Sequence, residues 1–252
     1  MEDSNQLVHL SEFKALLDNY QMSEESRQLL ASTKLVLLAA TTSSGRNTLI
    51  RQLLKTDKYH YIVSDTTRQP RINDGVYEQN GVEYWFRSEQ EILEDLRRGK
   101  FLEAAVIHDQ QVSGVSIREL EKAIGKGKVP ITDIEVVGVE SVVRVKPDTI
   151  AIFVLPPSFE EWQRRIKERG GMSSAEFCRR LTSAAKEFEM ALAEDYYIFA
   201  VNDQLENAAR DINHIVFDTI SLEEKQANQE YGKKLTAELL RETEQLLKSL
   251  DT

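Results

Sequence analysis

Short, continuous apolar runs recur along the chain and alternate with segments of helical periodicity. The runs share a richness in Val, Ile and Leu and are KLVLLAA (34–40), VPITDIE (129–135), TIAIFVL (149–155) and YYIFAVN (196–202). Such runs are typical of strands that are buried on both faces of a parallel sheet. Helical spacing of apolar residues is found at 48–55, 89–98, 116–126, 158–169, 174–194 and 204–217. Because strands alternate with helices, we expect an α/β fold with a mostly parallel sheet flanked by helices.

The segment that follows the second short strand, YHYIVS (59–64), differs from the rest of the chain in composition and in hydrophobic pattern. Polar residues with Pro70, Gly75 and Gly81 lead into an alternating stretch that ends at Phe86, a pattern that indicates loops and hairpins. We therefore expect residues of about 65–115 to form a small lobe inserted into a main domain of 33–218.

Helical extensions are predicted at both ends of the chain. The N-terminal extension, 1–32, contains two short helical patterns, with Ser11 and Ser23 as candidate N-caps. In the C-terminal segment, 219–252, Ser221 and Glu224 form a capping box before a long amphipathic helix. Its apolar stripe consists of Leu235, Leu239, Leu246 and Leu250. The stripe favours packing on the protein's own core, and a homodimer formed through the terminal helices is the alternative.

The composition narrows the classes of function and the compartment. The 252 residues include 42 acidic and 32 basic ones, and the net charge of −10 argues against general binding to nucleic acid or to an anionic membrane. The single cysteine, Cys178, cannot form an internal disulfide, which favours a reducing compartment. No stretch reaches the ~20 apolar residues that span a bilayer. We expect a cytoplasmic protein.

A glycine-containing turn, AATTSSGRN, joins the first apolar run to the next helix. Phosphate-binding loops follow the pattern G-x-x-x-x-G-K-[ST], and in that frame the chain has Ala40, Gly45, Arg46 and Asn47. Only Gly45 matches. Arg46 keeps a positive charge but is longer and forked, and Asn47 offers a carbonyl oxygen where a hydroxyl would contact Mg²⁺. Backbone N–H groups at the start of a helix still favour an anion, so we expect phosphate binding to survive better than catalysis.

The stretch SDTTRQPR (64–71) places two arginines beside a stiffening proline and several hydroxyl groups. Arg68 and Arg71 would suit a bidentate grip on a phosphate. Taken alone, the stretch is equally compatible with a solvated loop that carries spare charges.

Together with its neighbours, this stretch resembles the guanylate kinases. The family pattern has a phosphate loop, S-x-T-T-R-x-P-R, a G-x-x-Y-x-F hairpin, F-[IL]-E, D-I-[DE], I-F-[IL]-x-P-P, an R-x-x-x-R-G lid and V-N-D. After the loop, the chain matches these motifs in the same order with SDTTRQPR, GVEYWF, FLE, DIE, IFVLPPS, RIKERG and VND. The resemblance runs from about Lys34 to Phe217.

The resemblance implies a P-loop nucleoside-monophosphate-kinase fold with a GMP-binding lobe and a mobile lid at about 165–180. It also implies phosphoryl transfer from ATP to GMP or dGMP, with Mg²⁺. The implied GMP contacts are Ser64, Arg68, Arg71, Tyr84, Glu103, Ser113 and Glu135. The implied ATP contacts are Thr42, Ser43, Ser44, Gly45, Arg46, Asn47, Thr48 and Asn202. The implied catalytic residues are Arg46, Asp133, Arg165, Arg169 and Arg180, with Asn47 and Asp133 near the metal.

Several of these side chains also have a simpler interpretation. Glu103 could be a surface residue at a strand end, Glu135 a helix cap, Tyr84 an ordinary core aromatic, and the lid arginines a solvated face. Asp133 is harder to explain in this way, because it ends an apolar strand and burying an unpartnered carboxylate is costly.

The chain departs from the family pattern in the lobe as well. A segment that usually reads Y-Y-G-[ST] is Val112, Ser113, Gly114 and Val115 here. The loss of hydrogen bonds to the ligand predicts roughly ten- to a hundredfold weaker GMP binding, or a preference for another monophosphate. The degenerate loop also raises an alternative function, a binding or regulatory module for nucleotides or phosphopeptides. The retained arginines and acids favour the enzyme.

Overall fold

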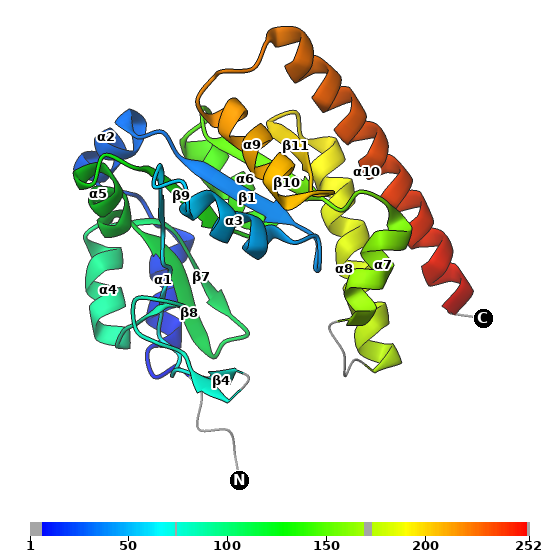
Figure 1. The fold of residues 1–252 in the computed structure, drawn as a ribbon. Helices are drawn as coiled ribbons and strands as arrows, with labels where there is room; N and C mark the ends of the chain where they lie inside the picture. Colours follow the sequence, from blue (N-terminus) through cyan, green and yellow to red (C-terminus); the bar gives the residue numbers. More distant parts are fainter. Residues whose placement is uncertain (1–6, 74, 169–172, 251–252) are drawn as a thin grey trace. The chain divides into compact units, whose positions relative to one another are not determined.

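The computed structural model describes residues 7–73, 75–168 and 173–250, which divide into two compact units. Unit 1 consists of Met1–Lys34 and His60–Pro130, and unit 2 of Leu35–Tyr59 and Ile131–Thr252. Figure 1 shows the course of the chain through both units.

Unit 2 is built on a sheet with the strand order β11-β10-β1-β9-β2, in which β1, β9, β10 and β11 are parallel. The strands are β1 (Val36–Ala40), β2 (Tyr59–Tyr61), β9 (Val129–Asp133), β10 (Ile150–Leu155) and β11 (Tyr197–Val201). The chain passes between the two units three times: between Lys34 and Leu35, within β2 and within β9. β1 lies between β10 and β9, and Ala40 at its carboxyl end pairs with Val154. The loop after β1 therefore leaves from the middle of the sheet at its carboxyl edge, the usual location of ligand sites in open α/β sheets.

The helices of unit 2 are α3 (Arg46–Leu54), α6 (Val136–Val145), α7 (Phe159–Glu168), α8 (Ser174–Ala193), α9 (Leu205–Val216) and α10 (Leu222–Leu250). Aromatic side chains join the sheet to α7 and α8. The ring of Phe153 on β10 contacts Phe188, Tyr197 and Phe199 at centroid distances of 5.6–6.2 Å. Trp162 on α7 lies edge-on to Phe188 at 5.6 Å. These buried rings fix α7 and α8 on the sheet that carries the loop.

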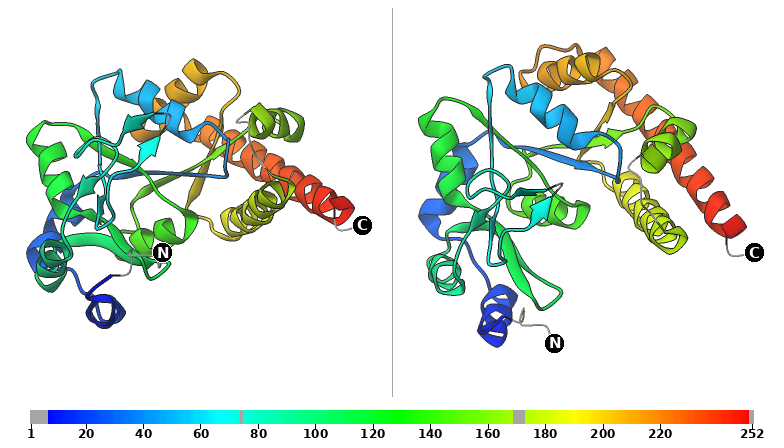
Figure 2. Two further views of the ribbon diagram at one scale, coloured as in Figure 1. Left: turned by 90° about the horizontal axis from the view of Figure 1, so that it is seen from below. Right: turned by 60° about the horizontal axis from the view of Figure 1, so that its bottom comes forward.

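The long C-terminal helix α10 packs within unit 2. It contacts α7, α8 and β11, and it runs beside α7 and α8 in Figures 1 and 2. Ser221 accepts a hydrogen bond from the Glu224 backbone, while Glu224 accepts one from Ser221, so the predicted capping box is confirmed. Leu235 and Leu239 are buried against the protein's own unit, as the favoured interpretation expected. A homodimer through this stripe remains a prediction, and Leu250 is the exposed end of the stripe.

Unit 1 holds a four-stranded sheet with the order β6-β3-β8-β7 and a separate two-stranded hairpin, β4-β5. The strands are β3 (Asp65–Thr66), β4 (Ile72–Asn73), β5 (Val76–Tyr77), β6 (Trp85–Phe86), β7 (Phe101–Ile107) and β8 (Gln111–Ser116). The helices are α1 (Leu10–Asp18), α2 (Glu24–Ser32), α4 (Glu89–Arg97) and α5 (Ile117–Gly125).

The N-terminal helix α1 covers one face of the unit 1 sheet together with α4. Phe13 of α1 is fully buried in a cluster with Phe101 and Val112 of the sheet and with Ile92, Leu93 and Leu96 of α4. Ala104 and Val106 of β7 point into the same cluster. Because side chains alternate along a strand, Glu103 and Ser113 belong to the opposite face of the sheet.

The predicted α/β fold is confirmed, and the differences are local. Ser23 accepts a hydrogen bond from Ser26 N and caps α2 as expected, but α1 begins at Leu10 after His9, so Ser11 lies inside the helix. The sequence analysis assigned no helix to 136–145, where α6 forms. This segment is rich in valine, which prefers strands in isolation, and packing of Val139 and Val142 overrides that preference.

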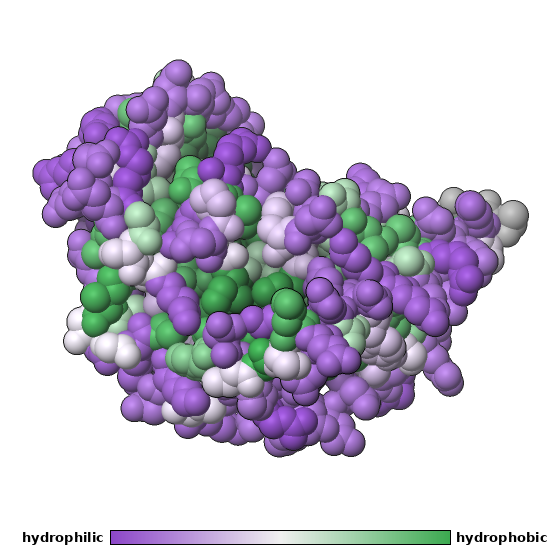
Figure 3. All heavy atoms as spheres, turned by 90° about the horizontal axis from the view of Figure 1, so that it is seen from above, coloured by the Kyte–Doolittle hydropathy of each residue, from purple (hydrophilic) through white to green (hydrophobic). Residues whose placement is uncertain are grey.

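The surface is mainly hydrophilic on the face shown in Figure 3, where apolar patches (green) are interrupted by polar residues (purple). Among the helices that the structure describes, none combines the length and the apolar character needed to cross a bilayer.

Candidate functional site

The loop between β1 and α3 has an unusual backbone that the sequence permits at two positions. Gly45 has a φ of 87° and Ser43 a φ of 62°, both in the left-handed region. A Cβ at position 45 would lie 2.2 Å from Nδ2 of Asn202, so glycine is required there for conformation and for space. Ser43 adopts the same region without that freedom, at an energetic cost that other contacts must offset.

The loop forms one wall of a cavity of about 530 Å³ in unit 2. Residues 40–48 line it together with Glu135, Val136, Arg165, Glu168 and Glu187. This size suits a small-molecule ligand. Every predicted ATP contact from Thr42 to Thr48 lines this cavity. The loop thus brings together the N–H groups of a helix start and two arginines, an arrangement that favours a polyanion.

Arg46 occupies the position of the loop lysine, and its guanidinium is fixed by three acceptors. Its Nη2 donates to Oδ2 of Asp133 at 2.7 Å, its Nη1 to the Ile134 carbonyl at 3.3 Å, and its Nε to Oδ1 of Asn47 at 3.4 Å. The three predicted residues Arg46, Asn47 and Asp133 therefore form one contact group at the carboxyl end of β9. A lysine ammonium could not reproduce this planar fork.

Asn202 is buried beneath the loop. Its Nδ2 donates to the Ser44 carbonyl at 2.9 Å, and its backbone carbonyl accepts a hydrogen bond from Nη2 of Arg165 at 3.1 Å. The resemblance implied a contact between Asn202 and adenine. In the structure, Nδ2 of Asn202 instead donates to the loop. A contact between adenine and the side-chain oxygen of Asn202 remains a prediction.

The lid arginines are held by acids on their own helices. Nε of Arg165 donates to Glu161 at 2.8 Å, and Nε of Arg180 donates to Glu176 at 2.8 Å. Arg165 lines the cavity, and Arg180 lies on α8 without lining it. Arg169 falls outside the described residues.

Glu187 is a cavity residue that the sequence analysis missed. Burial raises its pKa to about 7, the Glu135 carboxylate adds to this, and Ser183 and Arg46 oppose it. Its Oε2 is buried and finds no hydrogen-bond partner within the described part of the chain. A signal was available, because Glu187 shares the apolar face of α8 with Ala184 and Ala191, both of which are buried.

In unit 1, the guanidinium of Arg68 is already held by an acid and by two aromatic rings. Its Nη1 and Nη2 donate to the two carboxylate oxygens of Glu78 at 2.5 and 2.8 Å. Its guanidinium also lies over the rings of Tyr84, at 4.7 Å, and Phe86, at 5.5 Å. Glu78 additionally accepts the backbone N–H of Arg71 at 2.8 Å. Glu78 was missed by the sequence analysis, and it would compete with a phosphate for the Arg68 fork.

Two of the predicted lobe residues, Glu103 and Ser113, share one face of the unit 1 sheet with Val115. Glu103 pairs directly with Val115 in the β7-β8 ladder, and Ser113 lies two residues from Val115. Oγ of Ser113 donates to Oγ1 of Thr66 at 2.9 Å, which orients that hydroxyl on the neighbouring strand β3. Burial raises the pKa of Glu103 to about 7, and a hydrogen bond from the Val115 backbone opposes the rise. The carboxyl group of Glu103 is therefore buried, and its charge changes near neutral pH, unlike that of a solvated surface residue.

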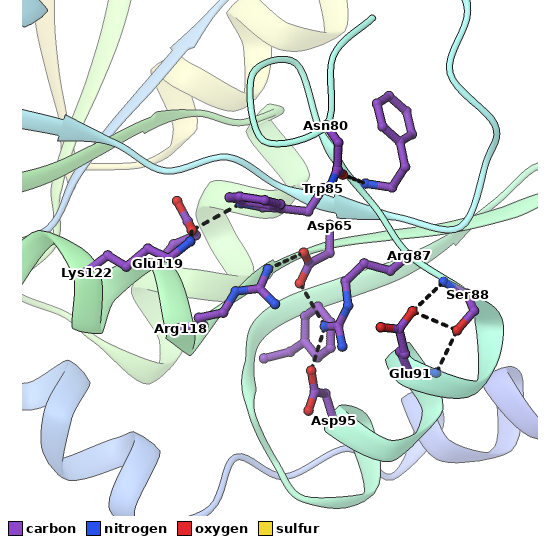
Figure 4. Close-up of polar contacts among 12 residues, drawn as sticks. Asp65, Asn80, Trp85, Arg87, Ser88, Glu91, Asp95, Arg118, Glu119 and Lys122 are labelled. Atoms are coloured by element: carbon purple, nitrogen blue, oxygen red, sulfur yellow. Dashed lines mark hydrogen bonds and ion pairs between the residues drawn. The ribbon is translucent and has the colours of Figure 1, made fainter.

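A charge network holds these strands in place (Figure 4). Asp65, fully buried on β3, accepts hydrogen bonds from Arg118 at 2.7 Å and from Arg87 at 3.5 Å. Arg87 also donates to Asp95 at 2.6 Å, which links β3 to α4. On the adjacent strand, the Trp85 indole donates to Glu119 of α5 at 3.1 Å. The Trp85 backbone N–H donates to the Ser64 carbonyl at 2.9 Å, which joins β6 to the residue before β3.

The predicted site residues fall into one group in each unit. Unit 1 contains Ser64, Arg68, Arg71, Tyr84, Glu103 and Ser113. Unit 2 contains the loop, Asp133, Arg165, Arg180 and Asn202. Glu135, predicted to contact guanine alongside Glu103, lines the loop cavity of unit 2 and sits at the N-cap of α6 without making a capping hydrogen bond.

In unit 2, the central strand of the sheet leads into a loop and then into the start of a helix, where backbone N–H groups favour an anion. This arrangement defines the class of phosphate-loop nucleotide-binding proteins. Comparison with known proteins narrows the class. The sequence model of the family described as guanylate kinase matches residues 32–219. The chain belongs to the guanylate kinase family.

Individual relatives agree over most of their length. Guanylate kinase of Clostridioides difficile (strain 630) is 34% identical over 183 residues, which is 72% of this chain and 86% of that protein. Guanylate kinase of Trichormus variabilis is 36% identical over 188 residues, or 74% and 91% of the two chains. A crystal structure of guanylate kinase from Anaplasma phagocytophilum has a TM-score of 0.54 at 26% identity and covers 75% of this chain and 87% of that one.

Proposed function

We propose that this protein is an ATP:GMP phosphotransferase that forms GDP and ADP. An oxygen of the GMP phosphate bonds to the γ-phosphorus of ATP while the bond from that phosphorus to the β,γ-bridging oxygen breaks. The observation that carries the proposal is the guanylate kinase match over residues 32–219, within which the loop and both lobe arginines fall. Full-length kinase relatives do not favour the alternative of a binding module.

We assign the triphosphate to the cavity of unit 2. Phosphoryl transfer needs positioning and charge neutralisation from the protein more than covalent chemistry. The Arg46 and Arg165 side chains that line the cavity bring positive charge to a polyphosphate, and the loop N–H groups add fixed dipoles. Arg169 and Arg180 are proposed to complete the lid that excludes water during transfer.

The donor groups around Arg46 suit Mg²⁺ when ATP brings its phosphates. No group of three His, Cys, Asp or Glu residues in the described part of the chain could hold a metal ion alone. The oxygens of Asp133 and Asn47 are hard donors, and both contact Arg46. They fit an ion that keeps most of its water and is held by phosphates and one or two protein groups, as is usual for Mg²⁺. When bound, Mg²⁺ neutralises charge on the phosphates.

We assign the acceptor nucleotide to unit 1. Arg68, Arg71, Ser64 and Tyr84 are proposed to bind its phosphate, with Ser113 alongside. Glu103 is proposed to accept hydrogen bonds from the guanine edge, which presents N–H donors. The single cysteine favours a reducing compartment, and a cytoplasmic location is part of the proposal.

The test is an assay of ADP formation with ATP and Mg²⁺ and with GMP, dGMP, AMP, CMP and UMP offered separately. We expect GMP or dGMP to raise ADP formation far above the rate without an acceptor, and AMP, CMP and UMP to do so least. The Arg68→Ala variant serves as the control for acceptor binding. ADP formation that does not depend on the acceptor would contradict the proposal.

A further inference from the structure

The phosphate loop of this chain lacks the first glycine of the usual pattern and has a serine in a left-handed conformation. Ala40 stands at the first glycine position, and Ser43 has a φ of 62°. Something other than glycine must therefore hold the loop backbone. A hydroxyl contact inside the loop, Thr41 Oγ1 to Ser44 Oγ at 2.8 Å, supplies part of this support.

The remaining support comes from outside the loop, through two of its carbonyl groups. The indole Nε1–H of Trp162 donates to the Thr42 carbonyl at 2.7 Å. Nδ2 of Asn202 donates to the Ser44 carbonyl at 2.9 Å. Trp162 is fully buried and packs edge-on against Phe188, so its indole is a rigid donor.

Fixing a carbonyl also fixes the next N–H group. In a trans peptide the C=O of one residue and the N–H of the next point in opposite directions. The Trp162 contact therefore turns the Ser43 N–H away from Trp162, and the Asn202 contact turns the Gly45 N–H away from Asn202. Neither Trp162 nor Asn202 lines the loop cavity, whereas Ser43 and Gly45 do. Both N–H groups therefore point away from the side chains that hold the carbonyls, and both belong to residues that line the cavity.

Two observations indicate that these groups are available to bind a ligand. Within the described part of the chain, the Ser43 and Gly45 N–H groups make no hydrogen bond. The Ser43 hydroxyl oxygen is buried and also finds no partner among the described residues. Donors of this kind, at the start of a helix, match phosphate oxygens.

We propose that Trp162 is a positioning residue for the ATP phosphates, because its indole N–H holds the Thr42–Ser43 peptide in the phosphate-binding orientation. The inference rests on the proposed function in that it takes ATP as the ligand of the cavity. Trp162 lies on α7, the same helix that carries Arg165. The helix thus orients the loop and supplies a cavity arginine at once.

The experiment compares Trp162→Phe with Trp85→Phe. The first removes the loop donor and keeps an aromatic ring against Phe188. The second makes the same chemical change in unit 1, where the Trp85 indole donates to Glu119. Calorimetry of both proteins with a non-hydrolysable ATP analogue and, separately, with GMP gives the dissociation constants. We expect Trp162→Phe to weaken ATP-analogue binding by about tenfold and to leave GMP binding within about twofold.

Turnover supplies the matching kinetic result. We expect the KM for ATP to rise in Trp162→Phe while the KM for GMP stays unchanged, a split that general loss of stability would not produce. Unchanged ATP affinity in Trp162→Phe, or equal losses for both nucleotides, would overturn the inference. If the wild type binds the ATP analogue but transfers no phosphoryl group, the proposed function fails while the affinity comparison still decides the role of Trp162.

A measurement on the wild type covers the case in which Trp162→Phe does not fold. The chain has two tryptophans, so its NMR spectrum has two indole N–H signals, and Trp85→Phe identifies the one from Trp162. We expect this signal to exchange slowly with D₂O and to shift on addition of the ATP analogue but not of GMP. Rapid exchange, or no shift with the ATP analogue, would overturn the inference.

Discussion

Glu103 and Val115 are direct partners in the antiparallel ladder of β7 and β8, so their side chains share one face of the unit 1 sheet. The family pattern has Ser or Thr at position 115, next to the acid that we assign to guanine. Val115 is 2% exposed, and its methyl groups offer the base no hydrogen bond.

Val115→Thr is expected to strengthen GMP binding by about three- to tenfold, because a hydroxyl at this position can bond to the base. The change keeps the side-chain shape but buries a hydroxyl, so a loss of unfolding free energy of about 1 kcal/mol is expected in the free protein. Calorimetry with GMP measures the effect, and Val112→Thr, on the opposite face of β8, is the matched control. Equal affinities of Val115→Thr and the wild type for GMP would contradict the assignment of this face.

GMP binding is expected to depend on pH through Glu103. Its pKa is raised to about 7 in the free protein, and the N–H donors of guanine favour the ionised carboxylate. Binding therefore lowers this pKa and releases a proton, so GMP affinity rises as the pH increases from 6 to about 8 and then levels off. Calorimetry in buffers of different ionisation enthalpy counts the proton. Glu103→Gln is expected to bind GMP more weakly and to release fewer protons in this range, the remainder coming from the GMP phosphate; proton release of the same size in this variant would rule out Glu103 as a source.

Arg46→Lys is expected to lower turnover at least tenfold, although it restores the residue that the loop pattern prefers. The sequence left both outcomes open. The structure favours the decrease, because three acceptors hold the planar guanidinium and lysine can satisfy only part of that arrangement. Arg51→Lys makes the same substitution at an exposed position of the same helix, so it is the control for the general effect of replacing arginine by lysine. A rise in kcat for Arg46→Lys would show that the loop is merely impaired.

Arg68→Ala is expected to weaken GMP binding by at least tenfold, because a charge-assisted contact to the phosphate is lost. Arg68→Lys should recover little of this affinity, since lysine cannot form the two-point contact with Glu78 or lie flat over Tyr84. Calorimetry with GMP and with guanosine separates phosphate binding from base binding. If Arg68→Ala weakens the binding of GMP and guanosine equally, Arg68 does not contact the phosphate.

The fold was largely readable from the sequence because its strands are continuous apolar runs and its helices have clear periodicity. The helix α6 was missed because its valines have a strand preference that only tertiary packing overrides. Motif spacing also predicted the loop and both lobe arginines as site residues, and the structure places the loop against the cavity of unit 2.

The partners of the site residues could not be read in the same way. The Trp162 indole and the Thr42 carbonyl are 120 residues apart, and no local pattern signals a hydrogen bond between them. The pairing of Arg68 with Glu78 spans ten residues around the β4-β5 hairpin, whose two-residue strands are too short to show a strand periodicity. Glu187 stood out only as an acid on an apolar helix face, which sequence alone does not connect to the loop.

The central claim is that this glycine-poor loop, with Arg46 in place of lysine, supports phosphoryl transfer from ATP to GMP. Phosphorus NMR of the wild-type protein with ATP, Mg²⁺ and GMP observes the transfer directly. The account predicts that the β-phosphate signals of GDP and ADP appear together in equal amounts as the GMP signal declines. Formation of ADP and inorganic phosphate with no GDP, or no change in any signal, would contradict it.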